Sequence, residues 1–90
     1  MRFDQLEYFY ALTSLKTVQA VSEKFYTSPQ VVSKAVRQLE KELNTTLFHR
    51  THRGLLLTED GVKFYPHAEE ILNHYQAIRQ LFIDKPPALD

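Results

Sequence analysis

The sequence predicts a mainly α-helical domain with one short β-hairpin, followed by a long helix. Three observations carry this fold class. Apolar residues recur at helical spacing in four segments. Two short apolar runs flank a basic turn within residues 46–57, and Pro86-Pro87 stop the last helical pattern. Ninety residues with 43% apolar content suffice for one modest core.

The first helix is expected from Asp4 to Leu15, where apolar and aromatic residues share one side. We expect Asp4 to cap its start and Lys16 to lie at its negative end. Its aromatic residues are interpreted as core.

A second, shorter helix is expected from Val18 to Phe25, with Thr17 as its N-cap. The small side chain of Ser22 would allow another helix to cross closely. Residues 26–28 then form a short connector to the next helix.

The third helix is predicted over residues 29–43. Ser28 is a good N-cap, Pro29 falls at the first helical position, and Asn44 can end the helix in a left-handed conformation. One face is apolar and would be buried. The opposite face has no carboxylate and consists of Gln30, Ser33, Lys34, Arg37 and Lys41.

Two short helices joined by a few residues, the second with a polar outer face, match a helix-turn-helix. The outer face suits a groove lined with hydrogen-bond acceptors and phosphates. The alternative for this helix alone is an ordinary solvated face.

A β-hairpin is predicted next. Residues 45–48 are expected to form one strand and residues 55–57 the other, with a polar turn at residues 49–54. We expect Arg50 and Arg53 in its tip. A basic hairpin beside a helix-turn-helix is a wing, here residues 46–57, able to place guanidinium groups on phosphates or in a narrow minor groove. The alternative is a solvated basic turn.

A long helix is predicted over residues 59–84, capped by Thr58. About 25 helical residues span about 37 Å, more than a domain of this size needs. Part of its apolar stripe would therefore lack a partner within the chain, which favours a homodimer over folding back along the first helix. The residues expected at the dimer interface are Tyr65, Ala68, Leu72, Tyr75, Ile78 and Phe82.

This reading divides the chain into a winged helix-turn-helix at 1–58, a linker or dimerisation helix at 59–84, and a linker start or tail at 85–90. The net charge is zero, with 11 basic and 11 acidic residues. It is unevenly spread, because residues 30–53 carry a net +3 and residues 54–84 a net −3. The central excess indicates a nucleic-acid partner for one part of the surface.

Other function classes find little support in the sequence. The chain has no cysteine, no signal peptide and no apolar run of the ~20 residues that span a bilayer, so we expect a cytoplasmic protein without membrane contact. Two glycines do not make a phosphate loop, and no catalytic set is spaced for an enzyme. The four histidines lack zinc-site spacing, so neither a metal nor a cofactor is expected.

The motifs together resemble the N-terminal DNA-binding domain of LysR-type transcriptional regulators. That family's pattern is roughly S-Q-P-A-[LV]-S-x-x-I-x-x-L-E-x-x-L-G-x-x-L-F-x-R-x-x-R-x-x-x-L-T-x-A-G, followed by a long helix. The resemblance covers about residues 2–83, and its most specific block runs from Leu47 to Thr58. The matching residues are Ser28, Ser33, Leu39, Glu40, Leu43, Leu47, Phe48, Arg50, Arg53, Leu57, Thr58, Gly61, Ala68, Ile71 and Leu72.

The chain departs from this pattern at a few positions. Pro29-Gln30 inverts the usual order, Asn44 replaces a glycine, Val21-Ser22 replace two alanines, and Lys34 stands where arginine is common. Lysine lacks the planar fork that reads guanine best, so we expect a base preference that differs from the family consensus.

The resemblance implies that helix 29–43 enters the major groove of double-stranded DNA and the wing lies at the minor groove. It also implies a homodimer, or a tetramer of a longer form, on a pseudo-palindromic site. A small-molecule effector would act only through a ~200-residue sensing domain, for which this chain has no room. The chain would then be a piece of a longer bacterial regulator or a stand-alone domain.

Gln30, Ser33 and Lys34 are the expected base-contacting residues. Phosphate or minor-groove contacts are expected from Ser28, Arg37, Arg50 and Arg53, and a backbone-amide contact at Thr17. Pro29 is also counted among the DNA-binding residues. The rival hypothesis, favoured by the zero net charge, is a winged helix that binds a protein and not DNA.

Overall fold

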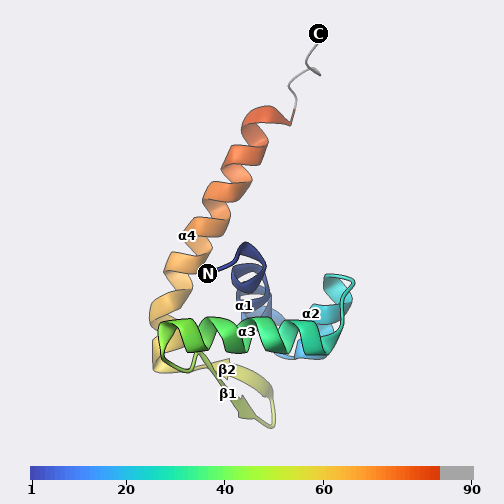
Figure 1. Cartoon of the computed structure of the whole chain (residues 1–90), viewed down its shortest axis with the longest axis vertical. Coiled ribbons are helices and arrows are strands. Elements are labelled where there is room, and N and C mark those ends of the chain that lie inside the picture. Colours follow the sequence, from blue (N-terminus) through green and yellow to red (C-terminus); the bar gives the residue numbers. More distant parts are fainter. Residues whose placement is uncertain (84–90) are drawn as a thin grey trace.

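The computed structural model describes residues 1–83 and confirms a mainly α-helical fold with a two-stranded sheet (Figure 1). In chain order the elements are α1 (Phe3–Leu15), α2 (Val18–Lys24), α3 (Pro29–Leu43), β1 (Phe48–Thr51), β2 (Gly54–Leu57) and α4 (Glu59–Phe82). The expected linker or tail at 85–90 and the expected last residue of the long helix lie outside the described residues.

The core lies where α1, α2 and α3 meet the hairpin and the first half of α4. Phe9, Leu12, Val21, Val32 and Leu39 are fully buried there. Phe9 joins the elements, since its ring lies 5.3 Å from that of Phe48 in β1 and 4.9 Å from that of Phe64 in α4. The predicted crossing at Ser22 is consistent with its burial between α2 and its neighbours.

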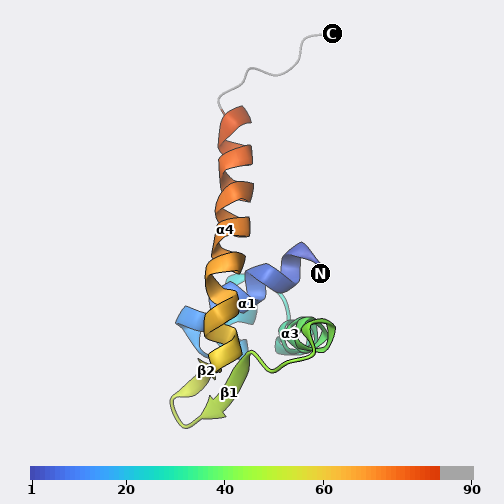
Figure 2. The same cartoon turned by 90° about the vertical axis from the view of Figure 1, so that its left-hand side faces the viewer.

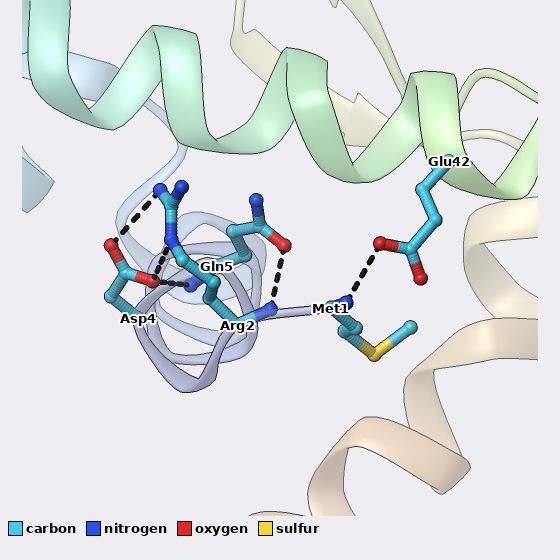
Figure 3. Close-up of polar contacts among 5 residues, drawn as sticks. All are labelled: Met1, Arg2, Asp4, Gln5 and Glu42. Atoms are coloured by element: carbon cyan, nitrogen blue, oxygen red, sulfur yellow. Dashed lines mark hydrogen bonds and ion pairs between the residues drawn. The ribbon is translucent and has the colours of Figure 1, made fainter.

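The start of α1 differs from the prediction. The helix begins at Phe3, so Arg2 occupies the capping position and Asp4 lies in the first turn. The backbone N–H of Arg2 donates to the side chain of Gln5 at 3.0 Å, while Asp4 accepts from the Arg2 guanidinium, which holds the pKa of Asp4 below its ordinary value (Figure 3). Asp4 is therefore a residue of the helix itself and not its cap.

The same close-up shows an ion pair between Met1, two residues before α1, and the last turn of α3. The ammonium group of Met1 lies 2.8 Å from Oε1 of Glu42.

The predicted caps of α2 and α3 are confirmed. The side chain of Thr17 accepts from the N–H of Ala20, and that of Ser28 from the N–H of Val31. Asn44 ends α3 in the left-handed conformation, at φ 53°. The predicted end of α2 at Phe25 is wrong by one residue, because left-handed Tyr26 at φ 55° reverses the chain directly after Phe25.

The hairpin, defined here as the wing (residues 48–57), is antiparallel and pairs Phe48 with Leu57 and Arg50 with Leu55. The predicted first strand at 45–48 and the predicted wing start at 46 are wrong, because β1 begins at Phe48. The backbone carbonyls of residues 46 and 47 instead accept hydrogen bonds from Thr58, the N-cap of α4. The Thr58 hydroxyl donates to the Thr46 carbonyl at 2.5 Å, and the Thr58 N–H donates to the Leu47 carbonyl at 2.9 Å.

Helix α4 runs unbroken through Pro66 and extends away from the body of the fold (Figures 1 and 2). Its N-cap Thr58 accepts from the N–H of Gly61, as predicted. The first half packs on α1 and β2, and its contact with α1 includes a hydrogen bond of 2.8 Å from the Tyr10 hydroxyl to Glu69. The wing and α3 lie at the end of the molecule opposite to the tip of α4, so the two predicted interfaces are spatially separate.

Candidate nucleic-acid interface

The outer face of α3 exposes most of the predicted reading residues. Gln30, Lys34 and Arg37 are exposed, while Ser33 is half-buried. Ser33 and Arg37 line a shallow cavity of about 240 Å³ together with Pro29, Gln30 and Val18. The structure thus brings Gln30, Ser33 and Arg37 together at the corner between α2 and α3, with Lys34 on the exposed side.

The two predicted contact residues at helix starts also serve as caps. Thr17 and Ser28 are exposed, and each hydroxyl oxygen accepts a backbone hydrogen bond, at 3.1 Å and 3.2 Å. A hydroxyl that accepts in this way retains its own proton for donation. Ser28 can therefore cap α3 and donate to a phosphate oxygen at once.

The two wing arginines occupy different positions. The prediction that both lie in the tip is wrong for Arg50, which belongs to β1 and pairs with Leu55. With Ser33, Arg37 and Phe48 it lines a cavity of about 220 Å³ between α3 and the wing. Arg53 lies in the tip, where its N–H donates to the Thr51 hydroxyl at 3.1 Å.

The wing is anchored to the corner between α1 and α2. The N–H of Leu55 donates to the carbonyl of Lys16 at 2.7 Å, and Lys16 ends α1 in the left-handed conformation. Gly54 permits this approach, since its φ is 102° and an added Cβ would lie 2.7 Å from the Lys16 carbonyl oxygen. The wing is therefore held at a fixed place beside α3.

The basic side chains of this surface are available for an anionic partner. Within residues 1–83, none of Lys34, Arg37, Arg50 and Arg53 forms an ion pair with a carboxylate. Four unneutralised cations on α3 and the wing favour phosphate binding despite the zero net charge of the chain.

Sequence reasoning named Glu40 only as a match to the family pattern and gave it no role, whereas it joins α3 to the start of the wing. Its Oε2 accepts from the N–H of Leu47 at 2.6 Å and from that of Phe48 at 3.3 Å. The available signal was the match of Leu39-Glu40 to the family pattern, which marks the position but does not reveal its hydrogen-bond partners.

In residues 1–83, no three His, Cys, Asp or Glu side chains converge to hold a metal ion. No helix there is long and apolar enough to cross a membrane.

A short helix, a polar-faced helix and an anchored basic hairpin define a winged helix-turn-helix DNA-binding domain. Residues 3–62 match the model of the bacterial regulatory helix-turn-helix protein, lysR family. This chain belongs to that family, and the matched residues form the family's helix-turn-helix domain.

Named relatives agree with this assignment. The chain is 34% identical over 73 residues to the transcriptional regulator ClcR of Pseudomonas putida, covering 81% of this chain and 25% of ClcR. It is 33% identical over 89 residues to the transcriptional activator IlvY of Haemophilus influenzae, covering 99% of this chain and 30% of IlvY. The chain thus spans about a quarter to a third of the length of these relatives.

A solved structure of the CbnR DNA-binding domain in complex with DNA is similar over 89% of this chain and 92% of that chain. The identity is 30% and the TM-score is 0.81.

Proposed function

We propose that this chain binds double-stranded DNA sequence-specifically, with α3 in the major groove and the wing at the flanking minor groove. The observation that carries the proposal is the shared cavity between α3 and β1. Arg37 and Arg50 line it from opposite elements, and neither is paired with a carboxylate within the described residues. A phosphate backbone that passes between the two grooves would lie between these guanidinium groups.

The contacts are proposed to divide into reading and positioning. Gln30, Ser33 and Lys34 point from the outer face of α3 and are proposed to contact base edges. Ser28, Arg37, Arg50 and Arg53 are proposed to bind phosphates or enter the minor groove, with Pro29 at the start of α3 beside them and Thr17 at the start of α2. The solved CbnR complex with DNA, similar over nearly the whole chain, supports this arrangement.

We further propose that two copies bind together through the outer half of α4. Ile71, Tyr75 and Ile78 are exposed there and recur at spacings of four and three residues, the pattern of a coiled-coil seam. Helix α4 contacts its own domain as far as Tyr75, whose ring lies 4.4 Å from that of Phe3, and its apolar side chains beyond that point are exposed and available to a partner. A second copy would place two α3 helices on one pseudo-palindromic site.

The proposed dimer surface is narrower than the predicted one. Ala68 is fully buried within the chain, and Tyr65 and Leu72 are half-buried against the domain, so these three belong mainly to the fold. Tyr75, Ile78 and Phe82 remain exposed, and Ile71 joins them.

We place any response to a small-molecule effector outside these 90 residues, since the regulators ClcR and IlvY are three to four times as long. A DNA partner also implies a cytoplasmic site of action.

Fluorescence anisotropy with a labelled duplex tests DNA binding against the rival of a protein-binding module. We expect binding to a random-sequence duplex at low salt, with an affinity that falls steeply as salt rises. Selection from a random pool should then enrich a two-fold symmetric sequence. No binding at low salt would exclude the DNA function and favour a protein partner.

A further inference from the structure

The carboxylate of Glu40 connects the reading helix to the wing. It projects from α3, and its Oε2 accepts from the N–H groups of Leu47 and Phe48, which lie where the loop enters β1. Both residues are buried, so these N–H groups are poorly placed to bind water instead. Hydrogen bonds to an ionised acceptor are roughly twice as strong as neutral ones.

A carboxylate at this position has an electrostatic cost for DNA binding. Glu40 lies one turn beyond Arg37 and lines the same cavity as Arg37 and Arg50, the proposed phosphate ligands. Within residues 1–83 it forms no ion pair with either arginine, so it does not serve to neutralise them. Its carboxylate instead accepts two backbone hydrogen bonds, which a fully solvated acid would not do.

The position of Phe48 determines where the wing arginines lie. Phe48 and Arg50 lie two residues apart in β1, so their side chains share one face of the strand, and both line the cavity beside α3. A displacement of the start of β1 would move Arg50 away from Arg37 and carry the tip residue Arg53 with it. Because the grooves of B-DNA have a fixed spacing, α3 and the wing bind one duplex together only at one separation.

The rest of the fold does not depend on this contact alone. Thr58 binds the carbonyls of Thr46 and Leu47, and Lys16 binds Leu55, so the loop and the wing stay attached without Glu40. Loss of the carboxylate is therefore expected to loosen the placement of the wing while the helical core remains folded.

We propose that Glu40 is a positioning residue for DNA recognition, whose carboxylate fixes the wing at the distance from α3 that both grooves require. The proposal rests on the proposed function, since it concerns how the wing arginines reach DNA that α3 already binds. It predicts that substitutions of Glu40 and of the wing residue Arg53 have non-additive effects on DNA affinity. The effects of substitutions of Glu40 and of the reading residue Lys34 should add.

A double-mutant cycle tests this prediction with a duplex that the wild-type chain selects from a random pool. Arg53→Ala and Lys34→Ala are each measured alone, with Glu40→Ala and with Glu40→Gln. Glu42→Gln is the matched control, because it removes the same charge from the same helix while its carboxylate contacts Met1 and not the wing. Circular dichroism and a thermal melt establish which variants are folded. If Glu40→Ala is unfolded, the cycle is measured with Glu40→Gln instead.

We expect Glu42→Gln to tighten binding slightly, since it removes a negative charge, and Glu40→Ala to weaken it about tenfold and flatten the salt dependence. In the Glu40→Ala background, Arg53→Ala should then weaken DNA binding by no more than about twofold. Lys34→Ala should weaken DNA binding as much in that background as in the wild type. The same fold loss for Arg53→Ala in both backgrounds, or tighter binding by Glu40→Ala, would overturn the positioning role. Failure of the wild-type chain to bind any duplex would instead refute the proposed function.

Discussion

The carbonyl oxygen of Leu47 lies 2.2 Å from the point where a Cβ on Gly61 would stand. Leu47 is the last residue before β1, and Gly61 lies in the first turn of α4. The absence of a side chain at Gly61 lets the loop rest directly on the helix, where the N–H of Thr58 binds the same carbonyl. The start of the wing thus contacts two helices. Glu40 binds it from α3, and Thr58 and Gly61 contact it at the start of α4.

Replacing Gly61 with alanine is expected to destabilise the fold by about 1–3 kcal/mol, because the new methyl group overlaps backbone that cannot move freely. This outcome would run against helix propensity, which favours alanine over glycine by up to ~1 kcal/mol. Urea unfolding of the two proteins measures the difference, with His67→Ala on the exposed side of α4 as the control. An unchanged or higher midpoint for Gly61→Ala would show that the loop does not rest on the helix.

Lys34→Ala and Arg53→Ala are expected to weaken DNA binding in different ways. Lys34→Ala should cost about 1–3 kcal/mol on the selected duplex and reduce discrimination against random DNA, since it removes a base contact. Arg53→Ala should weaken binding to both duplexes similarly and lower the salt slope by about 1, since it removes a phosphate contact. Anisotropy titrations on both duplexes at several salt concentrations measure these effects, and equal losses for Lys34→Ala on both would exclude base reading by Lys34.

Substitutions of Ser28 separate its capping role from its proposed phosphate contact. Ser28→Ala should cost ~1 kcal/mol of stability because the N–H of Val31 loses its acceptor. Ser28→Asp retains the cap but adds a negative charge to the DNA-facing surface, so stability should be kept while DNA affinity falls. Thermal melts and anisotropy distinguish the two effects; Ser28→Asn, a neutral cap, serves as the control. Unchanged DNA affinity in Ser28→Asp would place Ser28 away from the phosphates.

The hydroxyl of Tyr10 should make stability fall at high pH. Its pKa is raised well above the ordinary 10.0, first by hydrogen bonding with the Tyr65 hydroxyl and next by hydrogen bonding with Glu69. A raised folded-state pKa means that the contribution is fully present below about pH 10 and is lost as the unfolded chain ionises above it. The stability gap between wild type and Tyr10→Phe should therefore stay constant up to about pH 9 and narrow as the pH rises above about 10 in urea titrations.

Tyr26→Phe is the control for this pH series, because Tyr26 is 97% exposed. Its stability gap from the wild type should stay constant over the same range. A constant gap for Tyr10→Phe as well would show that the Tyr10 hydroxyl has no preferential interaction in the folded state.

The sequence predicted features that depend on neighbouring residues and missed those that depend on distant ones. Thr17, Ser28 and Thr58 were identifiable as caps because each hydroxyl binds an N–H three residues ahead. The start of β1 was not, because Glu40 and Thr58 bind the backbone of the segment that leads into it. β-Branched, apolar composition at 45–48 could not reveal partners from helices on either side.

The proposed dimer surface of α4 was also predicted only in part, because it depends on contacts with residues distant in the sequence. Periodicity placed Ala68 on the apolar stripe of α4, but only packing determines which part of that stripe α1 and the wing cover. The covered part includes Ala68, and the exposed part begins near Ile71.

Ile78→Glu is expected to separate the proposed dimer without unfolding the domain. Ile78 is 56% exposed in the single chain, so the substitution costs the monomer little, whereas two copies would bury unpaired carboxylates in an apolar seam. The dimer dissociation constant should rise on the order of 100-fold by sedimentation velocity, with Gln80→Glu on the other side of α4 as the charge-matched control. Affinity for a symmetric site should fall together with dimerisation, while binding to a single half-site stays the same. A dimer that persists in Ile78→Glu, or an equal loss in Gln80→Glu, would show that the Ile71–Ile78 seam is not the interface.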